Sequence, residues 1–253
     1  MATQRPDYGL DAPGVVRNFL LIGAAGLLSF ITLLLGLWNM RQRVAMVLVP
    51  LTWMGLAFGV TGLWMVYGSR IGKVRSRERY LDRLPWRGDE QVLDVGCGRG
   101  LFLIAAAKRL NQGGRAVGVD LWQAEDLAGN SPEATIANAR LEGVAERVDV
   151  KTGDARQLAL PDASFDVVVS SMALHNIYDE PGRRQAVAHI ARVLKPGGHV
   201  LIVDIRHTAE YADEIRRHSV EARASRSPLS YLAMLFTMGS LRTGVVTGRK
   251  RQP

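Results

Sequence analysis

Two long apolar segments near the N terminus constrain this chain more than any other feature of its sequence. Residues 19–38 and 44–67 form runs of 20 and 24 residues without a charged side chain. As α-helices rising about 1.5 Å per residue they extend about 30 Å and about 36 Å, and the hydrocarbon core of a bilayer is roughly 30 Å thick. The sequence therefore predicts two transmembrane helices, at about 19–38 and 44–67.

The connection between the two segments, residues 39–43, is so short that the helices are expected to form an antiparallel hairpin. Gly55 and Gly59 stand at a spacing that lets helices approach closely, and Gly23, Ala24 and Gly26 offer a facing smooth surface. Packing within the hairpin is the expected use of these residues, and a homodimer through the hairpin is the alternative. A secretory signal peptide usually has a shorter apolar region, about 7–15 residues, followed by a small-residue cleavage site. The first segment shows neither feature.

Basic residues are concentrated directly after the second segment. Seven of them lie from Arg70 to Arg87, whereas the short turn contains Arg41 and Arg43. Because basic residues favour the cytoplasmic side, both termini and everything after residue 67 are expected in the cytoplasm, with the chain a multi-pass membrane protein. A cluster at a membrane edge explains much of the net charge of +8. The expected partner is therefore the lipid bilayer, and no nucleic acid is expected.

From residue 90 onward the pattern changes to alternating strands and helices, which is typical of an α/β domain. The predicted organisation is a tail with two transmembrane helices at 1–67, a basic juxtamembrane segment at 68–90 and the α/β domain at 91–253. Strands are expected at 91–95, 116–120, 147–154, 165–171 and 199–205 and in the final GVVTGR, and helices at 101–110, from 132, and at 181–194. Cys97 is the single cysteine, so neither an intramolecular disulfide nor a multi-cysteine metal site is expected, and no metal is predicted.

The stretch VLDVGCGRG, residues 92–100, runs from a strand into a glycine-rich turn. Gly96, Gly98 and Gly100 follow G-x-G-x-G, so the turn lacks the G-x-G-x-x-G of a dinucleotide site and the Gly-Lys-Ser/Thr of a Walker loop. Asp94, at the mouth of the loop, would repel a pyrophosphate and attract an ammonium group. The expected ligand is a nucleoside that carries an amino acid.

Polar residues at the ends of the next strands support the same ligand. Asp120 ends the second strand, where a carboxylate can accept both hydroxyl groups of a ribose. Trp122 is suited to lie against an adenine ring. Asp154 and Ala155, which follow the third strand, can supply a carboxylate and a backbone amide to the polar edge of that ring.

Residues 92–204 resemble the class I S-adenosylmethionine-dependent methyltransferases. The resemblance rests on VLDVGCGRG, Asp120, the GDA at 153–155, FDVVVSSMALHNI at 165–177 and LKPGG at 194–198, and it covers none of the hairpin. It implies a Rossmann-like α/β fold with a seven-stranded sheet that has one antiparallel strand, and S-adenosyl-L-methionine as cofactor over the carboxyl ends of the first two strands. The implied cofactor-binding residues are Asp94, Gly96, Cys97, Gly98, Gly100, Asp120, Leu121, Trp122, Asp154, Ala155 and Ser171.

SSMALHNI and LKPGG look most similar to the small-molecule and quinone methyltransferases. The Asn/Asp-Pro-Pro-Tyr/Phe motif of enzymes that methylate amines of nucleobases or of glutamine is absent after the fourth strand. The sulfonium methyl is already electrophilic, so the protein must mainly align an acceptor and, for a hydroxyl or activated carbon, remove a proton. His175 is the candidate base, the alternative being a residue that shapes the rim of the site, and Tyr178 is a weaker candidate.

We therefore expect a membrane-anchored methyltransferase that acts on a hydrophobic or amphiphilic small molecule of lipid, quinone or isoprenoid type. One alternative is a methyltransferase for a soluble metabolite or toxic compound, with the hairpin used for location or assembly. Another is a non-catalytic, cofactor-binding membrane scaffold. The apolar residues 228–238 are expected either to pack in the core or to act as a pocket lid or membrane-dipping segment, since they are too few to span a bilayer. Cofactor recognition is expected to lie wholly within residues from 92 onward.

Overall fold

A computed structural model of the chain describes residues 5–36, 42–111, 113–226 and 243–252. The chain divides into two compact units, each described by itself below. The first unit comprises residues 1–9, 74–124 and 129–253, and the second comprises residues 10–73 and 125–128. The apolar segment 228–238 lies outside the described residues. So do Trp38, the last residue of the first predicted helix, and Arg41 in the predicted turn.

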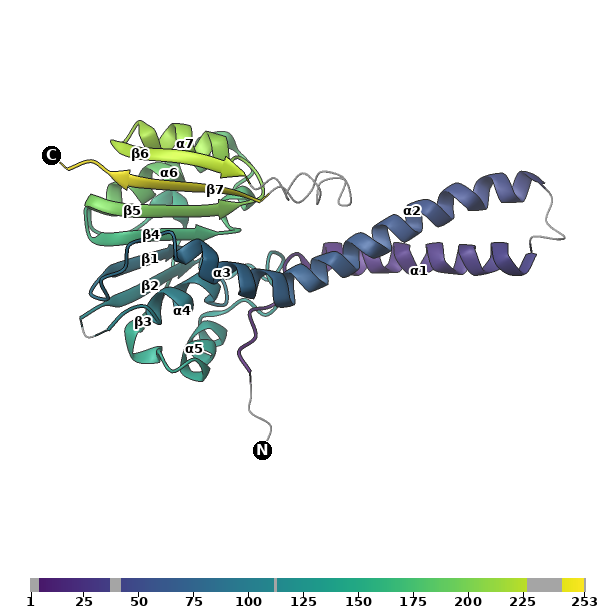
Figure 1. The fold of residues 1–253 in the computed structure, drawn as a ribbon, viewed down its shortest axis with the longest axis horizontal. Helices are drawn as coiled ribbons and strands as arrows, with labels where there is room; N and C mark the ends of the chain where they lie inside the picture. Colours follow the sequence, from purple (N-terminus) through teal and green to yellow (C-terminus); the bar gives the residue numbers. More distant parts are fainter. Residues whose placement is uncertain (1–4, 37–41, 112, 227–242, 253) are drawn as a thin grey trace. The chain divides into compact units, whose positions relative to one another are not determined.

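A mixed β-sheet organises the first unit (Figure 1). Within the described residues it has seven strands in the order β3-β2-β1-β4-β5-β7-β6. Their bounds are β1 (Gln91–Val95), β2 (Arg115–Asp120), β3 (Val148–Thr152), β4 (Phe165–Ser171), β5 (Leu194–Asp204), β6 (Val220–Arg226) and β7 (Gly244–Lys250). Strand β7 pairs antiparallel with both β5 and β6, while the pairs from β3 to β5 are parallel. The prediction of a seven-stranded sheet with one antiparallel strand is confirmed.

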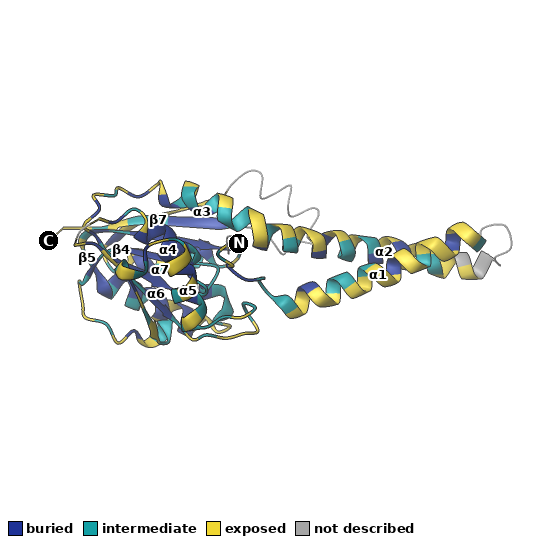
Figure 2. Cartoon of the chain, turned by 90° about the horizontal axis from the view of Figure 1, so that it is seen from below, coloured by how far each residue is buried: buried dark blue, intermediate teal, exposed yellow. Residues whose placement is uncertain are grey.

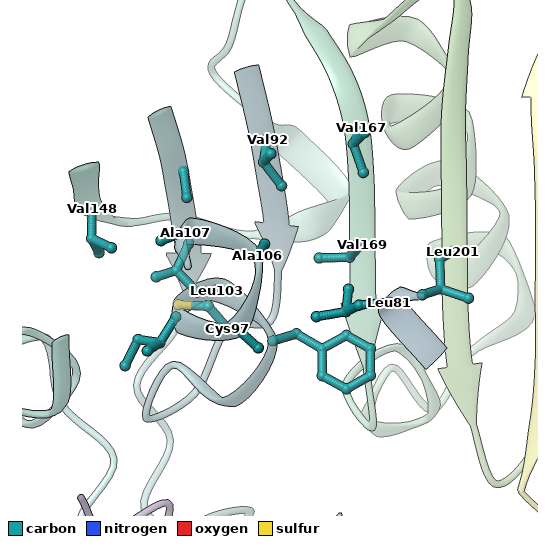
Figure 3. Close-up of a cluster of buried hydrophobic side chains, with 14 of the residues drawn as sticks. Leu81, Val92, Cys97, Leu103, Ala106, Ala107, Val148, Val167, Val169 and Leu201 are labelled. Carbon is teal, nitrogen blue, oxygen red and sulfur yellow. The ribbon is translucent and has the colours of Figure 1, made fainter. Parts of the chain in front are cut away.

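The central strands are buried on both faces because helices cover each side, which explains their almost continuous apolar sequences. Residues of α4 (Leu101–Ala107), α5 (Pro132–Leu141) and the end of α3 (Lys73–Leu81) pack with Val92 and Val169 on one face. Residues of α6 (Glu180–Val193) and α7 (Thr208–Arg216) pack with Leu93 and Val168 on the other. Figure 3 shows part of the first cluster, where α4 lies over the sheet.

Two local features explain where elements begin. Ser131 caps α5 by accepting the amide of Ala134, with Pro132 at the first helical position, and the helix begins at residue 132 as predicted. A strand was expected at 199–205, but β5 begins earlier, at Leu194, and includes LKPGG. Gly198 allows this, since a side chain there would stand 2.8 Å from the carbonyl oxygen of Asp166 on the neighbouring strand.

The second unit contains two long helices, α1 (Pro13–Gly36) and α2 (Gln42–Tyr67). Their backbones meet at glycines: a Cβ on Gly26 would stand 2.6 Å from the Cα of Gly55, and one on Gly23 would stand 2.5 Å from the Cα of Gly59. Ser29 accepts a hydrogen bond from Thr52 across the same interface, with an oxygen-to-oxygen distance of 3.0 Å. The glycines predicted to support packing within the hairpin are therefore used in that way.

Figure 2 shows that much of both helices is exposed, and many of the exposed side chains are large and apolar. Leu35 is 85% exposed and Trp53 is 71% exposed. Both helices are long and apolar enough to cross a membrane, by length and composition. A signal sequence near an N terminus and the core helix of a soluble protein can have the same length and composition. Core helices are mostly buried, whereas only 11% of the most apolar part of the first helix and 22% of that of the second are buried.

The junctions between the units differ from the predicted boundaries at one point. Residues 68–90 were expected as a basic juxtamembrane segment and contain a π-helical turn (Gly68–Gly72) followed by α3. Residues up to Gly9 were expected to belong with the transmembrane helices, but they are part of the first unit. The buried Tyr8 lies in the same apolar cluster as α4.

Candidate active site

The glycine loop connects β1 to α4 at the carboxyl end of the sheet, where open α/β sheets bind ligands. The amide of Gly96 donates to the carbonyl oxygen of Val119 at 2.8 Å, which brings the loop over the end of β2. Gly96 has φ of +73°, and a Cβ there would lie 2.1 Å from the Cβ of Ala173. Gly100 precedes α4 with φ of +85°. Both positions require glycine, so the spacing of the motif has a direct structural cause.

Asp94, on β1, is an ionisable group that is buried without a hydrogen-bond partner among the described residues. Its side chain is only 1% exposed, and neither carboxylate oxygen has a hydrogen-bond partner among the described residues. Burial raises the pKa of Asp94 to about 8; the nearby backbone amide of Leu103 opposes the rise, and the charge of Asp120 adds to it. A buried carboxylate without a partner is unfavourable by itself, so this position suits a cationic ligand group.

Asp120, at the end of β2, already has three hydrogen bonds. It accepts the amide of Gly98 at 2.8 Å, the amide of Trp122 at 2.7 Å and the side-chain amide of Asn130 at 3.1 Å. The carboxylate thereby holds the glycine loop and the turn after β2 together. A carboxylate offers about four acceptor positions, so binding both hydroxyls of a ribose would require the Asn130 amide to move aside.

The remaining predicted cofactor residues surround the carboxyl ends of β2, β3 and β4. Trp122 has φ of +60°, and its indole nitrogen donates to the hydroxyl of Thr152 at 2.8 Å. Leu121 is about half exposed, and Ala155 begins a short 3-10 turn. Ser171 is the last residue of β4. The structure therefore brings these residues to one edge of the sheet.

Asp154 is engaged by a neighbour in this structure. Its carboxylate accepts from the guanidinium of Arg156, with distances of 2.6 Å to Nη2 and 3.0 Å to Nε. These hydrogen bonds hold the pKa of Asp154 below its usual value. A contact from this carboxylate to an adenine amino group would compete with Arg156.

Cys97 turns its side chain into the core rather than toward a ligand (Figure 3). It is buried, and a side chain on Gly118 would come within 2.7 Å of its sulfur. Burial raises the pKa of the thiol well above its usual value, so the reactive thiolate is disfavoured. Among the described residues, no group of three or more His, Cys, Asp or Glu side chains is arranged to hold a metal ion.

His175 follows β4 and pairs with an acidic residue that the sequence analysis missed. Its Nδ1 lies 2.6 Å from Oδ1 of Asp204, the last residue of β5, and its backbone amide donates to Oδ2 at 3.1 Å. The ring and the carboxylate are close without ideal alignment, which is common before a substrate binds. The Asp204 side chain is 1% exposed and that of His175 is 18% exposed, so the ring connects a buried carboxyl group to the surface. The only sequence signal for Asp204 was its place at the carboxyl end of a strand.

Hydrogen bonds from Met172 and Arg183 fix the backbone of the loop around His175. Met172 has φ of +56° while its amide donates to the carbonyl of Val203 at 2.8 Å, a strained conformation of the kind found at functional sites. The buried Arg183 donates to the carbonyl oxygens of Ile177 and Tyr178. The side chain of Tyr178 itself is 94% exposed, so the structure gives the weaker candidate base no support.

Comparison with known proteins gives this arrangement a context. Residues 93–202 match the family described as "Methyltransferase domain". Nocamycin O-methyltransferase from Saccharothrix syringae is 40% identical over 122 residues, 48% of this chain and 40% of that protein. Demethylmenaquinone methyltransferase from Lactobacillus johnsonii is 31% identical over 130 residues, 51% of this chain and 49% of that protein. The chain thus spans about half the length of these curated relatives or less.

Solved structures agree on the fold. Geranyl diphosphate C-methyltransferase from Streptomyces coelicolor A3(2) superposes with a TM-score of 0.57 at 16% identity, covering 74% of this chain and 82% of that one. At this identity the likeness concerns the fold alone. Together the comparisons show that residues 93–202 are similar to methyltransferase domains and that the chain shares their fold.

Proposed function

We propose that the protein transfers a methyl group from S-adenosylmethionine to a hydrophobic or amphiphilic small molecule at a membrane. The observation that carries the proposal is the buried Asp94 carboxylate, which has no partner among the described residues and stands beside a glycine loop at the carboxyl end of β1. The ammonium group of the cofactor's amino acid would supply the missing positive charge. Asp120 would bind the ribose, and Trp122 with the 153–155 turn would receive the adenine.

The bound cofactor supplies an electrophilic methyl group, so the chain itself has to position the acceptor and manage one proton. His175 is the group we assign to that proton. With Nδ1 facing Asp204, the other ring nitrogen, Nε2, remains to accept a proton from an acceptor hydroxyl or acidic carbon. The buried Asp204 carboxylate would stabilise the imidazolium that forms.

A hydrophobic acceptor is supported by the relatives and by the rest of the chain. The relatives are named for methylating nocamycin and demethylmenaquinone. Two helices with exposed apolar surfaces suit an enzyme that meets its acceptor in a bilayer. A tether confines the enzyme to the surface where such an acceptor is concentrated.

The proposed membrane topology has two spans, with both termini and the methyltransferase domain in the cytoplasm. Residues 5–9 and residues from 74 onward belong to the same compact unit, which supports an even number of crossings between them. Arg75, Arg79 and Arg83 are exposed, stand four residues apart and have no acidic partner among the described residues. The acids between them, Glu78 and Asp82, pair with Arg109 instead. Three such arginines favour an anionic leaflet by about 1 kcal/mol each.

The test uses the full chain in its own membranes. Membranes containing the protein are incubated with cofactor labelled on the transferred methyl group, and the label is then partitioned between organic and aqueous phases. Label in the organic phase, lost in a matched Asp120→Ala preparation, supports the proposal. Label only in a water-soluble product favours the soluble-metabolite alternative. No transfer by a protein that still binds S-adenosylhomocysteine favours the non-catalytic scaffold.

A further inference from the structure

The residues that precede the first apolar helix form a short strap on the methyltransferase unit. The strap consists of residues 5–9, and Tyr8, its central side chain, is buried. The Tyr8 hydroxyl donates to Glu142 at 2.8 Å, and the guanidinium of Arg77 stands over the Tyr8 ring at 5.0 Å. Arg77 is itself buried, so the strap completes a polar cluster inside the unit rather than lying loosely on its surface.

The side chains of Asn138 and Arg99 connect this strap to the glycine loop. Asn138, on the buried face of α5, accepts the amide of Asp7 at 3.0 Å and donates to the Asp7 carbonyl oxygen at 2.8 Å. The same side-chain nitrogen donates to the carbonyl oxygen of Arg99 in the loop at 3.0 Å. Arg99 in turn pairs with the Asp7 carboxylate at 3.2 Å. The strap and the loop therefore share one hydrogen-bond network although they are far apart in the sequence.

The neighbouring contacts of the loop explain why this link is significant. The Gly98 amide is held by Asp120, and the Gly98 carbonyl oxygen accepts the hydroxyl of Thr135 at 2.7 Å, one turn before Asn138 on the same helix. Three side chains thus hold the loop in its conformation: Asp120, Thr135 and Asn138. Of these three, Asn138 also holds the strap. Moving the strap away would leave the Asn138 amide partly unpaired and would loosen one of these supports.

From this network we infer that the strap is a positioning element of the cofactor site. Asp7 and Tyr8 do not touch the cofactor in this scheme. Tyr8 anchors the strap through Glu142 and Arg77, and Asp7 holds Asn138 and, through it, the Gly98–Arg99 part of the loop, which raises the affinity for the cofactor. The inference rests on the proposed cofactor. It differs from the expectation, from the sequence, that recognition lies wholly after residue 92. Only residues 10–12 separate the strap from α1. A displacement of the start of α1 would therefore displace the strap as well and change the affinity for the cofactor.

Thermodynamic reciprocity provides a test that needs no known acceptor and no variant. If strap docking strengthens cofactor binding by some factor, bound cofactor must stabilise strap docking by the same factor. Hydrogen exchange is measured on the full chain in detergent, with and without saturating S-adenosylhomocysteine. We expect exchange of the residue 7–9 amides to slow about tenfold on saturation. Unchanged exchange in the strap, with protection of residues 96–100 by the same ligand, would overturn the inference.

Variants of the full chain give the second measurement. Asp7→Gly combined with Tyr8→Gly removes the side-chain anchors of the strap, namely the Asp7 carboxylate on Arg99 and the buried Tyr8 ring with its hydroxyl on Glu142. Asn138→Ala removes the side chain that bonds the Asp7 backbone. Each is expected to raise the Kd of S-adenosylhomocysteine at least tenfold, whereas Arg140→Ala, at an exposed position of α5, leaves it unchanged. Folded variants, by circular dichroism, that keep the wild-type Kd refute the inference. Failure of the wild-type protein to bind the ligand would instead refute the proposed cofactor.

Discussion

The buried Asp94 carboxylate predicts that cofactor binding releases a proton. With a pKa of about 8 in the free protein, about 0.9 of the Asp94 side chains carry a proton at pH 7. An ammonium group beside the carboxylate favours the ionised form and lowers its pKa. Binding at pH 7 is therefore expected to release about 0.9 proton per ligand, and the release from Asp94 is expected to fall as the pH rises toward 8.

The same shift predicts how stability depends on pH. The folded-state pKa of Asp94 lies above the ordinary value of 3.8, so the folded protein holds this proton more tightly than the unfolded chain. The contribution of the protonated Asp94 side chain to the free energy of unfolding is complete below pH 3.8 and is lost as the pH rises to about 8. At pH 7 the loss amounts to about 4 kcal/mol. Asp94→Asn removes the titration, but the amide buries one more unpaired donor than the neutral carboxyl group does, a penalty of about 1–3 kcal/mol.

Asp94→Asn is therefore expected to stabilise the cofactor-free protein by about 1–3 kcal/mol at pH 7. It is also expected to weaken S-adenosylhomocysteine binding roughly 10- to 150-fold, since a hydrogen bond to a charged group contributes about 1.5–3 kcal/mol. Calorimetric titration in two buffers with different ionisation enthalpies measures the proton release directly, and thermal unfolding measures the stability. Tight binding by the wild-type protein without proton release at pH 7 would refute the assignment of Asp94 to the ammonium group.

Three further predictions concern the rest of the site and the hairpin. Asp120→Ala is expected to abolish S-adenosylhomocysteine binding by calorimetry, because the carboxylate holds the loop and serves the ribose; unchanged affinity would contradict the whole nucleoside assignment. His175→Ala should lower turnover about 10²–10⁴-fold with the ligand Kd within about twofold, and Asp204→Asn should lower turnover and shift its pH profile. A residue that only shapes the rim would mainly raise the Michaelis constant of the acceptor. Gly55→Leu should destabilise the hairpin by about 1–3 kcal/mol in thermal unfolding in micelles, because its Cβ would stand 2.4 Å from the Cα of Gly26. Gly14→Leu, at a position where a Cβ has nothing within 4 Å, is the matched control, and equal stability of the two variants would contradict the packing described.

Several features were predictable from the sequence because their causes are local. Runs of β-branched residues predicted the strands from 91 to 171, and the glycine spacing predicted a turn that no side chain could enter at Gly96. The hairpin contact was predictable as well, since small residues at helical spacing leave only backbone at the interface of Gly26 and Gly55. In each case a periodicity or a conformational limit acts over a few residues.

Other features depend on contacts that no local pattern records. Asp204 and His175 meet because β4 and β5 are adjacent and end at the same edge of the sheet, although 29 residues separate them. The strap residue Asp7 meets Asn138 across a separation of 131 residues. The composition of the chain allowed many pairings for these groups, and local periodicity favoured none of them. The order of the strands and the packing of α5 selected one, because a buried polar group is stable only where the fold brings it a partner.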